Sequence, residues 1–241
     1  MQVALVGRGR LGRTLEVLLP RVGHRTEGVG RDRPVPPCDV VLLCVPDAAV
    51  AAVAASIPIG PVVLHCAGAL DLSVLAPHHR IGSLHPLMTF PGPEIAVPDL
   101  RGAPAAVAGT EEARAIATGL ARDLGMDPFE VPGDRRLYHA AAVMAGNLVT
   151  VLVHEAAQVL VEAGVSPEKA APILIPLALR SAENARHGLA ALTGPVARGD
   201  TATLDAHLAA MRDHGLETTR ALYDLLLKHA LGRRTADDRN R

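Results

Sequence analysis

Apolar residues follow two different patterns along the chain, and the change between them divides the sequence into two parts. Up to about residue 131, short runs of β-forming residues alternate with stretches of helical periodicity. The first run leads directly into a helix whose apolar side is marked by Leu11, Leu15 and Leu18. The runs predict strands at about residues 3–6, 24–29, 39–45, 61–66, 80–84, 103–108 and 127–131.

The run over residues 39–45 is apolar at nearly every position, which is typical of a strand buried on both faces of a parallel sheet. Strands that alternate with helices favour an α/β fold. We therefore predict a doubly wound, Rossmann-type parallel sheet over residues 1–132.

From Pro132-Gly133-Asp134 onward the periodicity is helical only, which predicts an all-α C-terminal domain over residues 133–231. Asp134 is placed to cap a long helix over residues 135–163 that ends at Gly164. Later helices are expected from Ser166-Pro167, kinked or interrupted at Pro172 and Pro176, and over residues 201–213 and 216–231. The tail over residues 232–241 is polar and charged, and we expect it to be disordered.

The predicted long helix carries no charged residue over residues 140–153. A helix that is apolar on most sides must be buried in its own domain or against another subunit. Because the helical domain is small, we expect a second copy to cover this helix in a homodimer.

The turn after the first strand has the spacing Gly7-x-Gly9-x-x-Gly12, and a helix follows at once. In a dinucleotide-binding unit these glycines permit the turn, the approach of a pyrophosphate and close helix packing. The helix N-terminus offers free N–H groups to the phosphates. The cofactor contacts we expect are Gly7, Arg8, Gly9, Arg10, Leu11, Gly12, Arg31, Val45, Pro46, Ala67 and Gly68.

The residues after the second predicted strand bear on the choice between NADP and NAD. Arg31 follows that strand, where an arginine can meet a ribose 2′-phosphate, and Arg8 could meet the phosphate from the other side. Asp32 favours the opposite choice, since an acid there can bind the ribose hydroxyls of NAD. We expect NADP, with NAD as the alternative.

Composition narrows the class of protein. The chain has 241 residues, is 49% apolar and carries a formal net charge of −1, which argues against general binding to nucleic acid or anionic membranes. Its three cysteines have neither zinc spacing nor a disulfide pattern, so we expect no metal site. We expect no apolar run of transmembrane length, and the N-terminus is a predicted strand, which makes the cytoplasm the expected location.

Several strings carry a resemblance to a known family. They are Gly7 to Gly12, Val45-Pro46-Asp47, His65-Cys66-Ala67-Gly68, residues 82–90, Tyr138-His139-Ala140-Ala141, Asn147 and residues 192–200. The chain resembles proteins with a Rossmann-like domain followed by an uncharacterised helical domain, related to pyrroline-5-carboxylate and ketopantoate reductases within the 6-phosphogluconate dehydrogenase-like group. The resemblance implies an NAD(P)-dependent reductase with a helical substrate and dimerisation domain, and 2-dehydropantoate as a candidate substrate.

This chain departs from that group in one respect. Ketopantoate reductases and related hydroxyacid dehydrogenases use a lysine on the long interdomain helix, whereas this chain has no lysine between residues 1 and 168. Another group must therefore supply the proton, if one is supplied.

Reduction of a carbonyl or imine needs a proton or hydrogen bond at the heteroatom, and histidine titrates in a suitable range. His139 at the start of the long helix and His85 after a predicted strand are the candidates, each with the alternative of a structural role. Asn147, eight residues after His139, lies about 12 Å further along a helix, so at most one of the two serves the reacting centre. Thr193 and Arg198 are candidate contacts for a substrate carboxylate, unless Asp200 merely caps a helix beside a solvated arginine.

Two classes of function follow from these residues. The first is an NADP-dependent oxidoreductase that reduces a small keto acid, or an imino acid as pyrroline-5-carboxylate reductases do. The second is a non-catalytic NADP-binding sensor or scaffold, which the missing lysine favours. The polar groups at positions 85, 139, 147 and 198 favour the enzyme.

Overall fold

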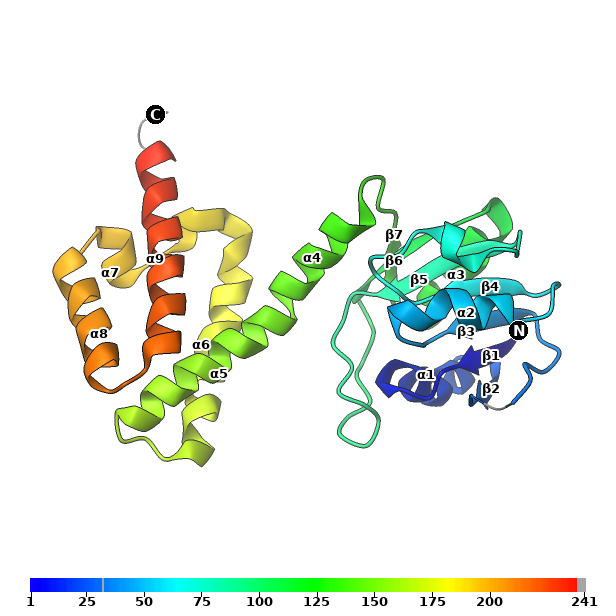
Figure 1. Cartoon of the computed structure of the whole chain (residues 1–241), viewed down its shortest axis with the longest axis horizontal. Coiled ribbons are helices and arrows are strands. Elements are labelled where there is room, and N and C mark those ends of the chain that lie inside the picture. The colour runs from blue at the N-terminus through cyan, green and yellow to red at the C-terminus, as the bar shows by residue number, and fades with distance from the viewer. Residues whose placement is uncertain (32, 238–241) are drawn as a thin grey trace. The chain divides into compact units, whose positions relative to one another are not determined.

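The computed structural model describes residues 1–31 and 33–237, with side chains described up to residue 232 (Figure 1). Contacts divide the chain into two compact units, Met1–Gly146 and Asn147–Arg241. By these contacts the helix that follows Pro132 belongs with the N-terminal unit, although the sequence pattern assigns it to the helical domain.

The N-terminal unit is built on one seven-stranded sheet with the order β2-β1-β3-β4-β5-β6-β7. All neighbouring strands pair in parallel except β5 and β6, which are antiparallel. The predicted α/β class and each of the predicted strands are confirmed. The strands are β1 (Gln2–Val6), β2 (Arg25–Val29), β3 (Val40–Leu43), β4 (Val62–His65), β5 (Ile81–Pro86), β6 (Pro104–Gly109) and β7 (Asp127–Phe129).

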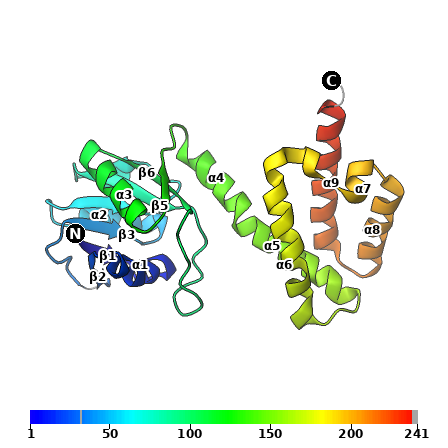
Figure 2. The same ribbon diagram turned by 180° about the vertical axis from the view of Figure 1, so that it is seen from behind.

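Helices cover both faces of this sheet, which explains why the strand sequences are almost entirely apolar. One core contains Val3 and Leu5 of β1 together with α1 (Arg10–Arg21) and α3 (Glu111–Asp123). The alternate residues Ala4 and Val6 face the second core, with α2 (Val50–Ala55). Figures 1 and 2 show α2 and α3 on opposite sides of the sheet.

The order of the strands indicates which edge of the sheet is suited to ligand binding. β2 and β3 lie on either side of β1, so the chain reverses its direction of winding at β1. In open α/β sheets ligands bind outside the carboxyl ends of the strands at such a reversal. The register pairs Val6 of β1 with Leu43 of β3, and Leu43 with His65 of β4, so the loops that follow these strands leave from the same edge.

The described residues of the C-terminal unit form helices and no strand, as predicted (Figure 2). In its core α5 packs on α6 and α8 on α9, and the hydroxyl of Thr219 on α9 donates to Glu155 on α5 at 2.5 Å. Its elements are α5 (Asn147–Glu162), α6 (Pro167–Asn184), the 3-10 helix η3 (Ala185–Ala191), α7 (Gly194–Arg198), α8 (Thr201–Asp213) and α9 (Glu217–Asp237).

The helices differ from the sequence-based expectation at three points. The predicted long helix is interrupted at Gly146, which separates α4 (Arg135–Ala145) from α5. α6 continues through Pro172 and Pro176, so the expected interruption is wrong. Both prolines are exposed, and the carbonyl groups that lose a hydrogen-bond donor can bond to water.

The third difference concerns the tail. α9 continues to Asp237, whereas the sequence predicts disorder from residue 232. The rest of that prediction, residues 238–241, lies outside the described residues.

Candidate functional site

A cleft of about 580 Å³ runs along the glycine turn at the carboxyl edge of the sheet. Its volume is within the range usual for small-molecule and cofactor sites. It is lined by residues that follow β1, β2 and β3, as expected for a ligand at the point of reversal. Of the expected cofactor contacts, the lining includes Gly7, Arg8, Gly9, Arg31, Val45 and Pro46.

Glycine is present at the three motif positions for different physical reasons. Gly7 has φ 107°, and a Cβ atom there would lie 2.5 Å from the carbonyl oxygen of Cys44. A Cβ atom on Gly12 would overlap the carbonyl oxygen of Gly7. Gly9 has φ −73° and nothing within 4 Å of a Cβ position among the described residues. The protein's own packing therefore requires Gly7 and Gly12, whereas the space beside Gly9 is open.

The start of α1 suits an anion. Gly9 is its N-cap and makes no side-chain cap, and its first turn contains no acidic residue. Backbone N–H groups and the helix dipole can therefore face a phosphate. Of the other expected contacts, Arg10 is exposed at this terminus, whereas Leu11 packs against the core.

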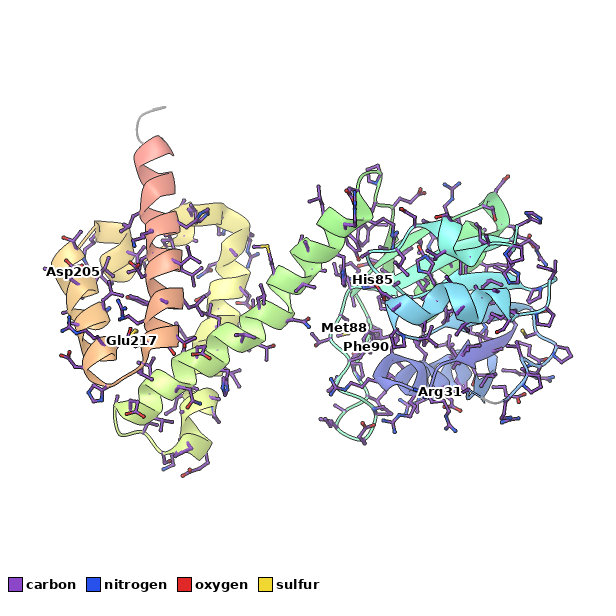
Figure 3. All side chains as sticks on the ribbon, in the orientation of Figure 1. Arg31, His85, Met88, Phe90, Asp205 and Glu217 are labelled. Atoms are coloured by element: carbon purple, nitrogen blue, oxygen red, sulfur yellow. The ribbon has the colours of Figure 1, made fainter. Side chains whose placement is uncertain are left out.

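The arginines of the cleft differ in their partners. Arg33 pairs with Glu27 of β2 at 3.1 Å, and Arg8 pairs with Glu16 at 3.6 Å. Arg31 lines the cleft, is exposed, and makes no ion pair within the described part of the chain (Figure 3). Its guanidinium is thus available for a 2′-phosphate. The competing candidate, Asp32, lies outside the described residues.

A second group of polar side chains gathers at the turn Ala67-Gly68 after β4. Nδ1 of His85, on β5, lies 2.7 Å from the hydroxyl oxygen of Tyr138 on α4. The rings of His85 and His139 meet edge to face, with their centres 5.8 Å apart. A Cβ atom on Gly68 would lie 2.5 Å from Cδ2 of His139 and 2.9 Å from Nε2 of His85. Glycine therefore permits both imidazoles to approach the backbone turn.

Arg135, on the first turn of α4, is the charged member of this cluster. It is 8% exposed, and its Nη2 donates to the carbonyl oxygen of Ala67 at 3.3 Å. Its Nε and Nη1 are buried without a hydrogen-bond partner among the described residues. Its guanidinium carbon lies 5.9 Å from the centre of the Tyr138 ring. Burial lowers the pKa of Arg135 below its ordinary value.

The surroundings also fix the charge of the neighbouring groups. Burial lowers the pKa of His85 to about 4, and His139 and Arg135 add to this effect, so the imidazole of His85 is neutral at neutral pH. Burial raises the pKa of Tyr138 above its ordinary value, with Arg135 opposing part of the rise. Its hydroxyl therefore keeps its proton at neutral pH.

The structure brings His85 and His139 together, as candidates for the same site, beside Ala67 and Gly68. The remaining sequence candidates lie in the C-terminal unit. Asn147 lies in the first turn of α5, directly after the interruption at Gly146, and its side chain is exposed rather than buried. Thr193 is the exposed residue that precedes α7, and Arg198 is exposed at its end.

Asp200 has the structural role that was the alternative for this loop. Its carboxylate caps α8 and accepts from the backbone N–H of Thr203 at 3.1 Å and from the Thr203 hydroxyl at 2.8 Å. Arg198 makes no ion pair within the described residues.

Sequence reasoning missed Arg135 and Tyr138 as site residues. A signal was present, since Arg135, Tyr138 and His139 are spaced i, i+3 and i+4 and so share one face of a helix. The side chain that this helix face contacts is His85, which is 53 residues away from Tyr138 in sequence. Among the described residues, no group of three or more metal-ligating side chains is arranged to hold a metal ion.

Residues 103–230 match a family described as a domain of unknown function, DUF2520. The chain belongs to this family. The match begins at β6 and continues through the C-terminal helices, so this DUF2520 protein combines a Rossmann-like α/β sheet unit with the helical part of the family domain. No curated protein matches the chain.

Solved structures show the same fold at low sequence identity. A Bacteroides fragilis protein provisionally described as an NADP oxidoreductase is 20% identical, with a TM-score of 0.78 over 96% of this chain and 98% of that one. A 1-pyrroline-5-carboxylate reductase from Streptococcus pyogenes is 17% identical, with a TM-score of 0.64 and coverages of 96% and 98%. A reductive aminase from Aspergillus terreus, in complex with NADPH, is 16% identical, with a TM-score of 0.70 and coverages of 96% and 94%. The DUF2520 protein therefore has the fold of NAD(P)-binding oxidoreductases.

Proposed function

We propose that this protein is an NADP-dependent reductase of a small carbonyl or imino compound. The observation that carries the proposal is the carboxyl edge of the sheet. The cleft at β1, β2 and β3 has the features of a dinucleotide site, and the paired side chains of His85 on β5 and Tyr138 on α4 lie by the turn after the neighbouring strand β4. A non-catalytic sensor would need the cleft but not the paired His85 and Tyr138.

The residues of the cleft fit NADP. The open space at Gly9 and the N-terminus of α1 suit the pyrophosphate, and Arg31 suits the 2′-phosphate. When bound, the reduced nicotinamide supplies a hydride. The chain's own task is then to orient the acceptor and to provide a proton at its heteroatom.

For the substrate we propose a small 2-keto acid, with 2-dehydropantoate as the first candidate from the family resemblance and an imino acid as the alternative. The similarity in fold to an imino-acid reductase supports this class without selecting between the two. Arg198 and Thr193 remain our candidates for contact with the carboxylate, since Arg198 is exposed and unpaired within the described residues.

The first test is a search for activity with cofactor. We expect the protein to oxidise NADPH in the presence of at least one small 2-keto or cyclic imino acid, followed by absorbance at 340 nm. Pantoate formed from 2-dehydropantoate, identified by mass spectrometry, would support the first candidate. Tight NADPH binding without oxidation by any keto or imino acid would instead support the sensor or scaffold function.

The second prediction concerns cofactor choice. One charge-assisted hydrogen bond is worth about 1.5–3 kcal/mol, so Arg31 should favour NADPH over NADH by roughly one to two powers of ten. Fluorescence titration should show this preference, and Arg31→Ala should remove most of it. Arg25→Ala is a matched control, because Arg25 begins β2 and Arg31 follows the other end of that strand. Equal affinities in the unchanged protein would contradict the prediction.

The third prediction concerns assembly. α5 and α6 expose a large apolar surface, and exposed patches of this kind mark interaction sites. We propose that a second copy of the chain covers it, in a homodimer formed through the helical unit. The exposed large apolar residues on these helices are Leu148, Val149, Val151, Leu152, Ile173, Ile175, Leu177 and Leu179.

A membrane is the competing partner for this surface. Taken together across Gly146, α4 and α5 (Arg135–Glu162) are long and apolar enough to cross a bilayer by length and composition. The expectation that no apolar run reaches that length is therefore wrong by this criterion. Light scattering at micromolar concentration without detergent should give about twice the chain mass of 25.1 kDa. A monodisperse monomer, or a particle that needs detergent to stay in solution, would contradict the homodimer.

A further inference from the structure

The cluster at the turn after β4 contains a pair of side chains joined by a short hydrogen bond. Nδ1 of His85 and the hydroxyl oxygen of Tyr138 are 2.7 Å apart, and their rings meet edge to face with centres 5.5 Å apart. The ring of Phe129, at the end of β7, also meets the ring of Tyr138, with their centres 6.0 Å apart. Tyr138 is therefore held in one orientation from two strands.

We propose that Tyr138 is the group that delivers the proton to the substrate heteroatom, and that His85 and Arg135 position and stabilise it. This inference rests on the proposed reductase function and names a catalytic residue for it. In this proposal the acid that takes the place of the absent lysine is a phenol and not a histidine.

The charge states favour the phenol over His85 as the acid. A histidine gives up a proton readily only from its charged form, and the imidazole of His85 is neutral at neutral pH. The Tyr138 hydroxyl carries a proton under the same conditions. His139 makes only an edge contact with His85, and no hydrogen bond from its ring is formed within the described part of the chain.

The tautomer of His85 decides which proton is free. If Nδ1 is unprotonated, it accepts the phenolic proton and that proton cannot reach a substrate. If Nδ1 carries the proton, it donates to the hydroxyl oxygen of Tyr138, and the phenolic proton is free to point at a substrate. The proposal requires the second tautomer.

The proton transfer then balances as follows. The phenolic O–H bond breaks, the proton bonds to the substrate heteroatom, and the electron pair stays on the oxygen of Tyr138. The Nδ1 proton of His85 moves to that oxygen while a proton from solvent bonds to Nε2. Tyr138 is restored and His85 ends neutral with its proton on Nε2. Loss of that proton to solvent and uptake of one at Nδ1 restores the starting tautomer before the next turnover, so the net change is the consumption of one solvent proton.

The phenolate formed in this step needs a positive charge nearby. Arg135 provides one, with its guanidinium carbon 5.9 Å from the Tyr138 ring centre, and it is fixed by its hydrogen bond to Ala67. The remaining titratable groups that influence this cluster are His65 on β4, His139 on α4, and Asp71, whose charge acts on Arg135. No carboxylate forms an ion pair with Arg135 among the described residues, and Asp71 acts on it only through its charge.

The first experiment compares the chain's two tyrosines. Tyr223 also lies beside a histidine Nδ1, that of His207 at 2.9 Å, but in the C-terminal unit. Tyr138→Phe should lower kcat by about 10²–10⁴ with cofactor affinity unchanged. Tyr223→Phe is the matched control and should keep the activity of the unchanged protein. A loss of that size in His139→Gln but not in Tyr138→Phe would overturn the proposal.

The second experiment needs neither cofactor nor substrate. The chain has no tryptophan, so in Tyr223→Phe the ultraviolet absorbance change at 295 nm reports only the ionisation of Tyr138. Arg135→Met should raise the midpoint of this titration, because a positive charge that favours the phenolate is removed. Arg136→Met is the control, since Arg136 is exposed and pairs with Asp134 at 2.7 Å. An unchanged midpoint in Arg135→Met would overturn the role of Arg135.

The third experiment reads the tautomer directly and covers the case in which a variant fails to fold. In the unchanged, ¹⁵N-labelled protein at pH 7, the His85 ring should carry its proton on Nδ1. A proton on Nε2 instead would overturn the proposal. If no substrate is reduced, the proposed function fails, whereas the titration and the tautomer still decide whether the Tyr138–His85 pair has the required protonation.

Discussion

Replacing Gly12 with alanine is expected to lower the free energy of unfolding by about 1–3 kcal/mol, the usual cost of overpacking. The added Cβ atom would overlap the backbone carbonyl oxygen of Gly7, which is a rigid neighbour. Alanine is the better helix former by about 0.8–1.0 kcal/mol, and Gly12 lies within α1, so an unobstructed position would instead gain stability. Whether Gly12→Ala lowers or raises the free energy of unfolding therefore tests the close approach of α1 to the turn.

Two matched substitutions isolate the cause. Gly119→Ala lies within α3 with nothing within 4 Å of its Cβ position among the described residues, and should raise stability by up to about 1 kcal/mol. Gly9→Ala should keep the melting temperature but weaken NADPH binding, because its Cβ atom enters space left for the pyrophosphate. Thermal unfolding and cofactor titration measure both. Full cofactor affinity in Gly9→Ala would contradict the placement of the pyrophosphate at this turn.

The parts of the fold that the sequence predicts well are local. The turn at Gly7, Gly9 and Gly12 joins a strand and a helix that are adjacent in the chain, so spacing alone identifies it. The strand runs are apolar because helices cover both faces of the sheet, and that pattern can be recognised without knowing which strands pair. The observed sheet agrees with the mostly parallel, doubly covered arrangement that these apolar runs predict.

The parts that the sequence does not predict depend on distant partners or on exposure. Tyr138 has no local signal of function until β5 brings His85 to within hydrogen-bonding distance. Arg135 follows a helix cap and looks like a surface residue, yet it is 8% exposed. Asn147 looks buried because apolar residues surround it in sequence, but the interruption at Gly146 places it at a helix start. Pro172 is tolerated within α6 because it faces solvent, and periodicity does not reveal that.

Acid should destabilise the N-terminal unit strongly, and buried histidines are the reason. His65 is fully buried on β4, and neither ring nitrogen makes a hydrogen bond of good geometry within the described part of the chain, although the backbone of Ala67 is near enough to oppose part of the fall in its pKa. Burial, with the charge of Arg135 added, lowers the pKa of His65 to about 4. Burial likewise lowers the pKa of His85 to about 4.

The direction in which stability changes with pH follows from proton uptake by the folded and unfolded chains. The unfolded chain binds protons at these histidines as the pH falls through about 6.5, whereas the folded chain does so only near pH 4. Stability is therefore lost between about pH 6.5 and pH 4, and these two groups cause no further loss below that window. A shift of this size corresponds to roughly 3 kcal/mol for each histidine.

His65→Leu separates this effect from general acid sensitivity. It replaces an unpartnered buried imidazole with an apolar side chain, so stability at pH 7.5 should be kept or increased. The loss of stability between pH 6.5 and pH 4.5, measured by urea unfolding, should fall by about half, because His85 remains. His79→Leu is the control, since His79 is exposed on the same unit, and should leave the pH dependence unchanged. If His65→Leu and the unchanged protein lose stability equally over this window, the neutral, buried state of His65 is not the cause.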